Sequence, residues 1–129
     1  MTEAALNKLA RQALDCAFRV HKALGPGLLE SAYKACLAIE LRKLGLSVEI
    51  EFPCPLVYEG EKVCDVGYRM DLLVEQELVL EIKAVEALIP VHQAQLLSYL
   101  RLSNKRLGLL INFNVPMLRD GIKRVVNQL

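Results

Sequence analysis

A short polar turn between two apolar runs, within residues 71–84, constrains the fold of this chain more than any other stretch. Residues 71–74 and 78–84 are largely apolar, and Glu75-Gln76-Glu77 separates them. Two apolar runs joined by so short a turn predict an antiparallel β-hairpin. We expect the rest of the chain to be arranged around this hairpin.

The charged residues of the hairpin limit what it can do. Because side chains alternate between the faces of a strand, Glu81 and Lys83 share one face, and Leu80 and Ile82 share the other. A turn near residues 76–77 brings Asp71 roughly opposite Glu81, within a slip of one residue. Charges are rare in buried strands unless they are paired or bind a metal. Two interpretations remain open at this point: an ion pair on a solvated sheet face, or a functional cluster.

The length and composition favour one compact domain over residues 1–129. Hydrophobic residues make up 53% of the chain, which is enough for a sizeable core. No apolar run is long enough to span a membrane. The start of the chain carries Glu3 and lacks the basic and apolar regions of a secretory signal, so we expect no membrane association.

The cysteines are widely spaced, with no Cys-x-x-Cys pair and no neighbouring pair of histidines. This spacing argues against a zinc site and indicates buried, reduced thiols, as in a cytoplasmic protein. The four cysteines are Cys16, Cys36, Cys54 and Cys64.

The C-terminal third of the chain is basic, although the net charge of the whole chain is only +1. Residues 87–129 contain six basic residues and one acidic residue. They predict either a surface that faces phosphate groups or an ordinary solvated surface. The basic residues are Arg101, Lys105, Arg106, Arg119, Lys123 and Arg124.

Hydrophobic periodicity predicts an α/β fold in which helices flank a mixed β-sheet, in the order α-α-β-β-β-β-α-β. In the third helix we expect Val91, Ala94 and Leu97 to pack inward, with Leu100 as a further candidate. Residues 122–126 form a short strand or a helix. The elements are helices at 2–24, 28–44 and 91–102, and strands at 47–57, 62–68, 71–74, 78–84 and 106–113.

Three segments together resemble a known family. Residues 27–33, Gly-Leu-Leu-Glu-Ser-Ala-Tyr, match the signature that names the GxxExxY family. Asp71 followed by Glu81-Ile82-Lys83 resembles the divided PD-(D/E)XK signature, although Met70 stands where the signature has proline. Residues 93–100 are similar to the helix that follows this signature in the same family. The resemblance extends over nearly the whole chain.

The resemblance implies a restriction-endonuclease-like core and a Mg²⁺- or Mn²⁺-dependent nuclease that hydrolyses phosphodiester bonds. It implies nucleic acid as the partner, DNA in preference to RNA. A hard cation with oxygen ligands can activate water and stabilise phosphoryl charge. The metal ligands would be Asp71, Glu81, the backbone carbonyl of Ile82 and Glu30.

The resemblance also implies roles for neighbouring side chains. Lys83 would orient or deprotonate the attacking water, or offset charge in the transition state. Tyr33 and Gln95 would hydrogen-bond substrate or ligands, and Tyr99 is a packing residue with a polar tip near the substrate. Taken alone, Glu30 has a simpler interpretation, because an acid in the first turn of a helix is stabilised by the helix dipole.

Other functions have less support in the sequence. Asp65 lies on the preceding strand, where we expect an exposed carboxylate, and His21 and His92 are expected at the surface or at helix ends. The sequence contains no Ser/His/Asp arrangement and no Gly-rich phosphate loop. Two alternatives to the nuclease remain: a non-catalytic nucleic-acid-binding module that keeps the fold, and a homo-oligomeric assembly protein.

Overall fold

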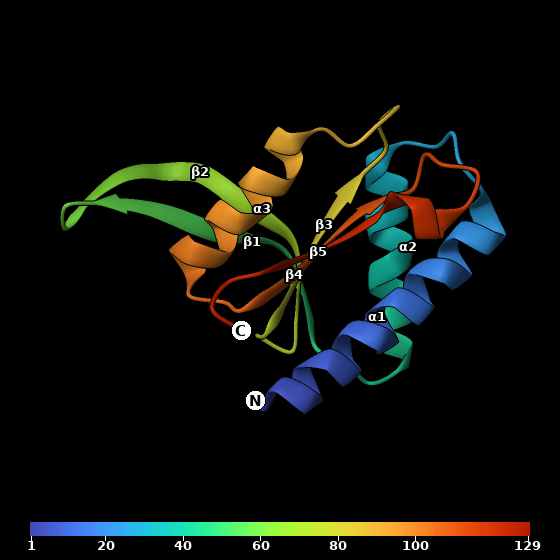
Figure 1. Ribbon diagram of the computed structural model, residues 1–129, viewed down its shortest axis with the longest axis horizontal. Coiled ribbons are helices and arrows are strands. Elements are labelled where there is room, and N and C mark those ends of the chain that lie inside the picture. Colours follow the sequence, from blue (N-terminus) through green and yellow to red (C-terminus); the bar gives the residue numbers. More distant parts are fainter.

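A computed structural model describes residues 1–63 and 67–129 and shows a mixed sheet covered by helices on both faces (Figure 1). The described part of the chain has five strands in the spatial order β1-β2-β3-β4-β5. The helices are α1 (Glu3–Leu24), α2 (Glu30–Lys43), α3 (Pro90–Ser103) and the short 3-10 helix η1 (Leu118–Gly121). The strands are β1 (Val48–Tyr58), β2 (Glu61–Val74), β3 (Leu78–Lys83), β4 (Leu107–Asn112) and β5 (Ile122–Val126).

The sheet is antiparallel except between β3 and β4, which run parallel. Parallel neighbours need a crossover connection, and α3 provides it. The predicted α/β class, with a mixed sheet between helices, is therefore confirmed. Strand β4 is buried along its whole length.

The predicted division of the strands is wrong in one place, and the structure decides one alternative that the sequence left open. Residues 62–68 and 71–74 were expected as two strands, but they belong to the single strand β2. No turn-forming residue separates Tyr68 from Asp71, so nothing stops the strand there. Residues 122–126 form the edge strand β5, antiparallel to β4. The observed order is thus α-α-β-β-β-α-β-β, with η1 before the last strand.

One face of the sheet packs against α1 and α2 and forms the larger of two cores. The side chains of this α1/α2 core include Leu6, Leu37, Leu72 and Leu80, all fully buried. Thr2 caps the start of α1, because its side chain accepts a hydrogen bond from Ala5 N at 3.0 Å. This layer is built from the apolar stripes that periodicity predicts.

The other face packs against α3 alone and forms the smaller α3 core, which includes Leu73, Val79, Leu96 and Tyr99. The expected inward stripe of α3 is wrong in part: Val91 and Ala94 are exposed, and Leu97 is partly buried. The expected burial of Leu100 is confirmed, but the helix is turned so that Leu96 and Tyr99 face the sheet with it. Gly108 of β4 permits this, because a Cβ there would lie 2.8 Å from a methyl carbon of Leu96.

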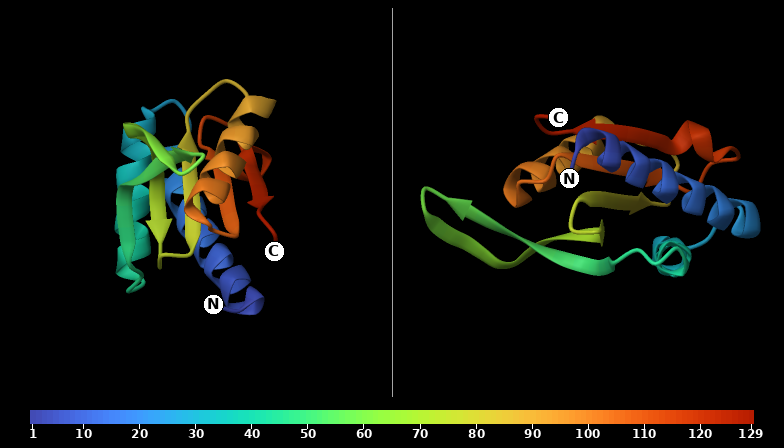
Figure 2. Two further views of the ribbon diagram at one scale, coloured as in Figure 1. Left: turned by 90° about the vertical axis from the view of Figure 1, so that its left-hand side faces the viewer. Right: turned by 90° about the horizontal axis from the view of Figure 1, so that it is seen from below.

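The distal halves of β1 and β2 leave the sheet as a two-stranded arm that projects beyond α3 (Figures 1 and 2). Glu59 and Gly60 form its turn, with positive φ angles of 50° and 81°. Apolar side chains remain exposed along the arm, among them Val57 and Tyr58. A two-stranded ribbon has little core of its own, so the arm is held mainly by its backbone ladder and its base.

The fold bears on two expectations, the absence of a membrane-spanning segment and the burial of the cysteines. Within the described residues, no helix is both long and apolar enough to cross a membrane. Cys16 and Cys54 are buried free thiols and Cys36 is a partly buried one, whereas Cys64 lies outside the described residues. Asp65, the alternative strand carboxylate, also lies outside them.

Candidate functional site

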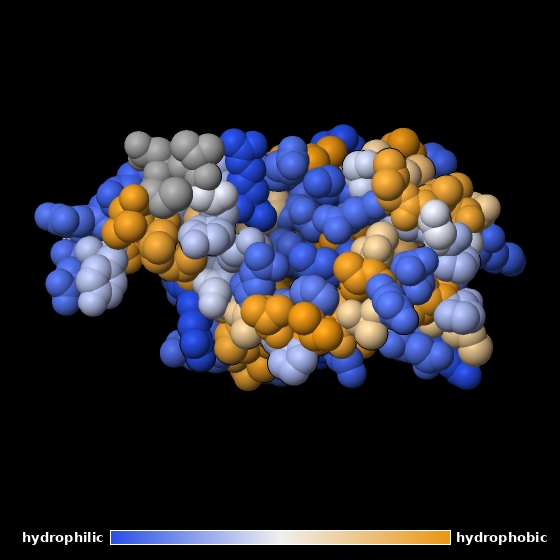
Figure 3. All heavy atoms as spheres, turned by 90° about the horizontal axis from the view of Figure 1, so that it is seen from above, coloured by the Kyte–Doolittle hydropathy of each residue, from blue (hydrophilic) through white to orange (hydrophobic). Residues whose placement is uncertain are grey.

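The candidate site lies where β2 and β3 stop pairing. The ladder ends with Leu72 opposite Leu80, so Asp71 and Glu81 face each other at the next position. The expected pairing of these two carboxylates is therefore confirmed, without a slip. In Figure 1, β3 ends at the same upper edge of the molecule where α2 and α3 begin. Seen from above, hydrophilic side chains gather over the middle of this edge, with apolar patches to either side (Figure 3).

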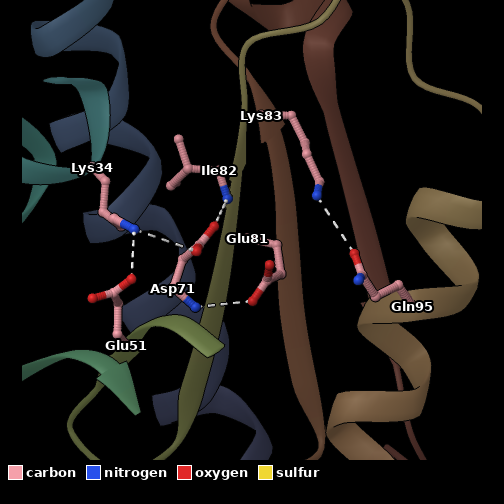
Figure 4. Close-up of polar contacts among 7 residues, drawn as sticks. All are labelled: Lys34, Glu51, Asp71, Glu81, Ile82, Lys83 and Gln95. Atoms are coloured by element: carbon pink, nitrogen blue, oxygen red, sulfur yellow. Dashed lines mark hydrogen bonds and ion pairs between the residues drawn. The ribbon is translucent and has the colours of Figure 1, made fainter. Parts of the chain in front are cut away.

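Two hydrogen bonds between backbone and side chain lock the carboxylates together (Figure 4). Asp71 N donates to Glu81 Oε1 at 3.0 Å, and Ile82 N donates to Asp71 Oδ2 at 2.8 Å. These side chains thus continue the ladder in place of backbone carbonyls. These two backbone hydrogen bonds engage Glu81 Oε1 and Asp71 Oδ2, one oxygen of each carboxylate.

A left-handed residue in β1 redirects the sheet at this point. Glu51 lies opposite Asp71 and has a φ of 53°. Leu72 packs in the α1/α2 core, whereas Met70 packs in the α3 core, although residues two apart in a regular strand share a face. The strands therefore switch faces at Glu51 and Asp71. A left-handed conformation costs a non-glycine residue about 1–2 kcal/mol, and such strain is concentrated at functional sites.

Lys34 of α2 is the cation nearest to Asp71. Its Nζ lies 3.7 Å from Asp71 Oδ1 and 3.5 Å from the Glu51 carboxylate (Figure 4). The side chain of Lys34 is only 17% exposed, so water screens these contacts less than it does at an open surface. An ammonium group thus lies beside the oxygen of Asp71 that the backbone leaves available.

Glu30, the first residue of α2, faces the same cluster. Burial raises the pKa of its carboxyl group, the charge of Asp71 raises it further, and Lys83 and Lys34 oppose the rise. Glu30 therefore lies within electrostatic range of Asp71, Lys83 and Lys34. The stabilisation of Glu30 by the helix dipole is therefore part of a larger electrostatic arrangement.

Lys83 points from β3 toward α3. Its Nζ donates to Gln95 Oε1 at 3.4 Å (Figure 4). Glu81 is only 4% exposed, and within the described residues no ion pair joins it to Lys83. The interpretation of Glu81 and Lys83 as an ion pair on a solvated face is therefore wrong.

The two candidate tyrosines lie in different places. Tyr33 is fully buried, stacks on Phe113 with ring centroids 4.6 Å apart, and donates to Gly25 O at 2.5 Å. Its hydroxyl also accepts from Leu28 N at 3.1 Å, so it is engaged with the loop that precedes Glu30. Tyr99 lies in the α3 core. Burial raises the pKa of Tyr99 to about 12, and the charges of Glu81 and then Asp71 add to this rise.

Glu81 is the most perturbed carboxyl group of the site. Burial, followed by the charge of Asp71, raises its pKa from 4.5 to about 8, although the hydrogen bond from Asp71 N opposes the rise. The Glu81 side chain is therefore largely protonated at neutral pH when no cation is nearby. Two carboxylates this close need a positive charge before both can ionise.

The protein-family model described as the PD-(D/E)XK nuclease superfamily matches residues 7–125 of the sequence. This span contains every residue of the candidate site. The chain belongs to the PD-(D/E)XK nuclease superfamily. The mixed sheet between helices is consistent with its restriction-endonuclease-like fold. No curated protein and no solved structure matches the chain.

Nucleases of the PD-(D/E)XK superfamily typically use divalent metals, and the donor set of this chain fits such an ion. Within residues 1–63 and 67–129, no group of three or more His, Cys, Asp or Glu side chains could hold a metal by itself. Asp71 and Glu81 would thus be the side-chain ligands, with Glu30 acting from farther away. Mg²⁺ suits this set, because it usually keeps several waters and takes one or two carboxylates together with phosphate oxygens.

The carbonyl of Ile82 is the expected backbone ligand, and the direction of the strand is compatible with that role. The oxygen of Lys83 accepts from Phe113 N at 2.9 Å, on the β4 side. Successive carbonyls of a strand point to opposite edges, so the carbonyl of Ile82 points toward β2. The β2–β3 ladder has already ended there. This oxygen therefore points to the same side as Asp71.

Sequence reasoning missed three residues that shape this nuclease-like site. Lys34 could have been found, because it lies four residues after Glu30 and thus on the same helix face. Glu51 gave no signal, since its left-handed conformation is unusual for Glu. Asn112 ends an apolar strand and is buried. Its side chain donates to Val85 O at 2.9 Å and accepts from Val85 N at 3.1 Å, which fixes the chain just beyond Lys83.

The remaining candidates lie away from the carboxylates. His92 accepts from Ile89 N at 3.1 Å at the start of α3, and His21 contacts Val115 O at 2.8 Å. Two of the basic C-terminal residues have different surroundings: Arg106 donates to Met1 O, whereas Lys123 borders a groove between α3 and β5. That groove has a volume of about 600 Å³, and Gln93 and Ala94 line it but the candidate site residues do not.

Proposed function

We propose that this protein is a divalent-metal-dependent nuclease of the GxxExxY branch, which hydrolyses phosphodiester bonds in nucleic acid, DNA in preference to RNA. The observation that carries the proposal is the locked pair of Asp71 and Glu81 at the unpaired end of the hairpin, with Lys83 two residues further on. In this proposal the cation is Mg²⁺ or Mn²⁺, and the protein acts in the cytoplasm.

A stabilising role accounts poorly for this arrangement. Burial of a carboxyl group beside another carboxylate is unfavourable, as the raised pKa of Glu81 indicates. A bound metal ion would offset this unfavourable charge, and the metal could then bind a phosphate group. The two carboxylates would hold the metal, which would polarise the phosphate and activate a water molecule.

The lysine and the glutamine would act on the substrate side of the metal. Lys83 carries a positive charge on the α3 face of the sheet, where it can offset charge developing on the phosphoryl oxygens. Gln95 holds the ammonium group of Lys83. Tyr33 would act indirectly, because its hydroxyl fixes residues 25–28 just before Glu30.

The proposal is tested by cleavage of single- and double-stranded DNA and RNA with Mg²⁺ or Mn²⁺. We expect cleavage by the wild type to fall roughly a hundredfold or more in Asp71→Asn and in Lys83→Ala, equivalent to about 3 kcal/mol or more in the barrier. Asp15→Asn and Lys43→Ala change exposed residues of α1 and α2 and serve as matched controls.

Metal binding without substrate separates the nuclease from its alternative. Calorimetry should show weak Mg²⁺ binding by the wild type and none by an Asp71→Asn, Glu81→Gln double variant. Equal binding by the two proteins would contradict the metal site. If metal binds but no substrate is cleaved, the non-catalytic nucleic-acid-binding module becomes the better assignment.

A further inference from the structure

A second hollow adjoins the candidate site, between the base of the β1–β2 arm and α3. It has a volume of about 280 Å³ and is lined by Leu56, Tyr68, Gln95, Ser98, Tyr99 and Leu102. We propose that this slot receives one unpaired nucleobase of a nucleic acid whose scissile phosphate lies at Asp71 and Glu81. The inference rests on the proposed function and narrows its substrate to single-stranded or locally unpaired nucleic acid.

Two residues of α3, Gln95 and Tyr99, connect the slot with the carboxylate cluster. Gln95 lines the slot and also accepts the hydrogen bond from Lys83 Nζ at 3.4 Å. Tyr99 lines it one helical turn later, near enough to Glu81 and Asp71 for their charges to raise the pKa of its hydroxyl. A nucleotide with its phosphate at the cluster could therefore place its base in the slot.

The aromatic side chains of the slot are arranged to accept a flat ring. Tyr68 is 45% exposed, and its ring centroid lies 6.1 Å from that of Tyr99 at an interplanar angle of 47°. The two rings are therefore not stacked on each other, and Tyr68 presents aromatic surface to solvent. Stacking of a nucleobase on an aromatic side chain contributes about 1–3 kcal/mol to the free energy of binding, whichever base it is.

The other lining groups agree with a base rather than with a larger ligand. Leu56 and Leu102 provide apolar walls, whereas Gln95 and Ser98 provide polar atoms for the edge of a base. The volume is slightly below the range of about 300–1,000 Å³ that is typical of small-molecule pockets. A base still stacked in a duplex cannot enter such a slot, so the nucleotide must be unpaired or flipped out.

The test measures binding without cleavage, in the Lys83→Ala background. The probes are short single-stranded oligonucleotides that carry 2-aminopurine, as DNA and as RNA, and the same DNA as a duplex. Stacking quenches 2-aminopurine, so fluorescence reports entry of a base into the slot. Tyr68→Ala should weaken single-strand binding about tenfold and abolish the quenching, whereas Tyr68→Phe should preserve both.

Tyr58→Ala is the matched control, because Tyr58 is a 65%-exposed tyrosine near the tip of the same arm. It should bind and quench like its parent. Two results would contradict the proposed slot. One is equal binding by Tyr68→Ala and Tyr58→Ala, and the other is an equal fall in fluorescence on protein binding for the duplex and the single strand. Comparison of the DNA and RNA probes shows which of the two nucleic acids the slot binds more tightly.

Cleavage in the otherwise wild-type protein distinguishes failure of the slot from failure of the nuclease. If Tyr68→Ala cleaves and binds single strands normally while Asp71→Asn does not cleave, the slot is wrong and the nuclease stands. If quenching depends on Tyr68 but the wild type cleaves nothing, base binding stands and the nuclease is wrong.

Discussion

The two faces of the sheet differ in what their side chains do, and strand β3 shows the difference within six residues. Toward α1 and α2 it presents Leu78, Leu80 and Ile82, all fully buried among apolar groups. Toward α3 it presents Val79, then Glu81 and Lys83. Alternation along one strand thus places stabilising residues on one face and the candidate chemistry on the other.

The difference extends to the helices that cover each face. The α1/α2 core is closed by two helices, whereas the single helix α3 leaves a groove toward β5 and a slot toward the arm. A face that must admit substrate cannot be sealed by apolar packing. Its polar groups are instead fixed by hydrogen bonds, such as those of Asp71 with Glu81 and Ile82.

The largest expected effect compares neighbouring leucines of β2 on opposite faces. Leu72 and Leu73 are both fully buried, the first in the α1/α2 core and the second in the α3 core. We expect Leu72→Ala to lower the free energy of unfolding by about 4 kcal/mol and Leu73→Ala by about 3 kcal/mol, because α3 has open space beside it and can close a cavity more easily. Denaturant unfolding measures both, and a larger loss of unfolding free energy in Leu73→Ala would contradict this difference between the two cores.

The next effect concerns the pH dependence of stability in the absence of divalent metal. The pKa of Glu81 is about 8 in the folded protein and near 4.5 when unfolded, so between these values the native state binds more protons. Stability from this group is therefore fully present below about pH 4.5 and is lost as pH rises through about 8. We expect Glu81→Gln to be more stable than the wild type at pH 9, on the order of 3 kcal/mol.

Glu86→Gln is the control for this measurement, because Glu86 is exposed and lies five residues further along the chain. Thermal and denaturant unfolding between pH 5 and pH 9 provide the comparison. If the wild type and Glu81→Gln differ by the same amount at every pH, Glu81 does not titrate between its unfolded and folded values as assigned.

The smallest expected effect is on metal affinity. Lys34 Nζ lies 3.7 Å from Asp71 Oδ1, so the ammonium group competes with a cation for that oxygen. We expect Lys34→Met to bind Mn²⁺ roughly three- to tenfold more tightly, in line with the modest energy of a partly exposed ion pair. Lys43→Met is the control, since Lys43 pairs with Glu40 on the same helix at 3.1 Å. Weaker Mn²⁺ binding by Lys34→Met than by the control would mean that Lys34 supports the metal instead of competing with it.

Local sequence signals were enough to predict the hairpin and the juxtaposition of its carboxylates. Alternating apolar residues and a short polar turn determine which residues of 71–83 share a face and which oppose each other. The helix start at Thr2 and the burial of β4 followed from equally local patterns. The ordered signatures at Glu30, Asp71 and residues 81–83 then identified the superfamily, because they describe chemistry as well as fold.

The tertiary structure decided everything that depends on residues distant in sequence. The rotation of α3 that buries Leu96 depends on the space left by Gly108 of another strand, and the slot combines Tyr68 with residues of that helix. Glu51 adopts a left-handed conformation opposite Asp71, and Lys34 reaches across from α2 to both. Periodicity describes one element at a time, whereas these arrangements arise from how separate elements fit together, and only the assembled fold determines that fit.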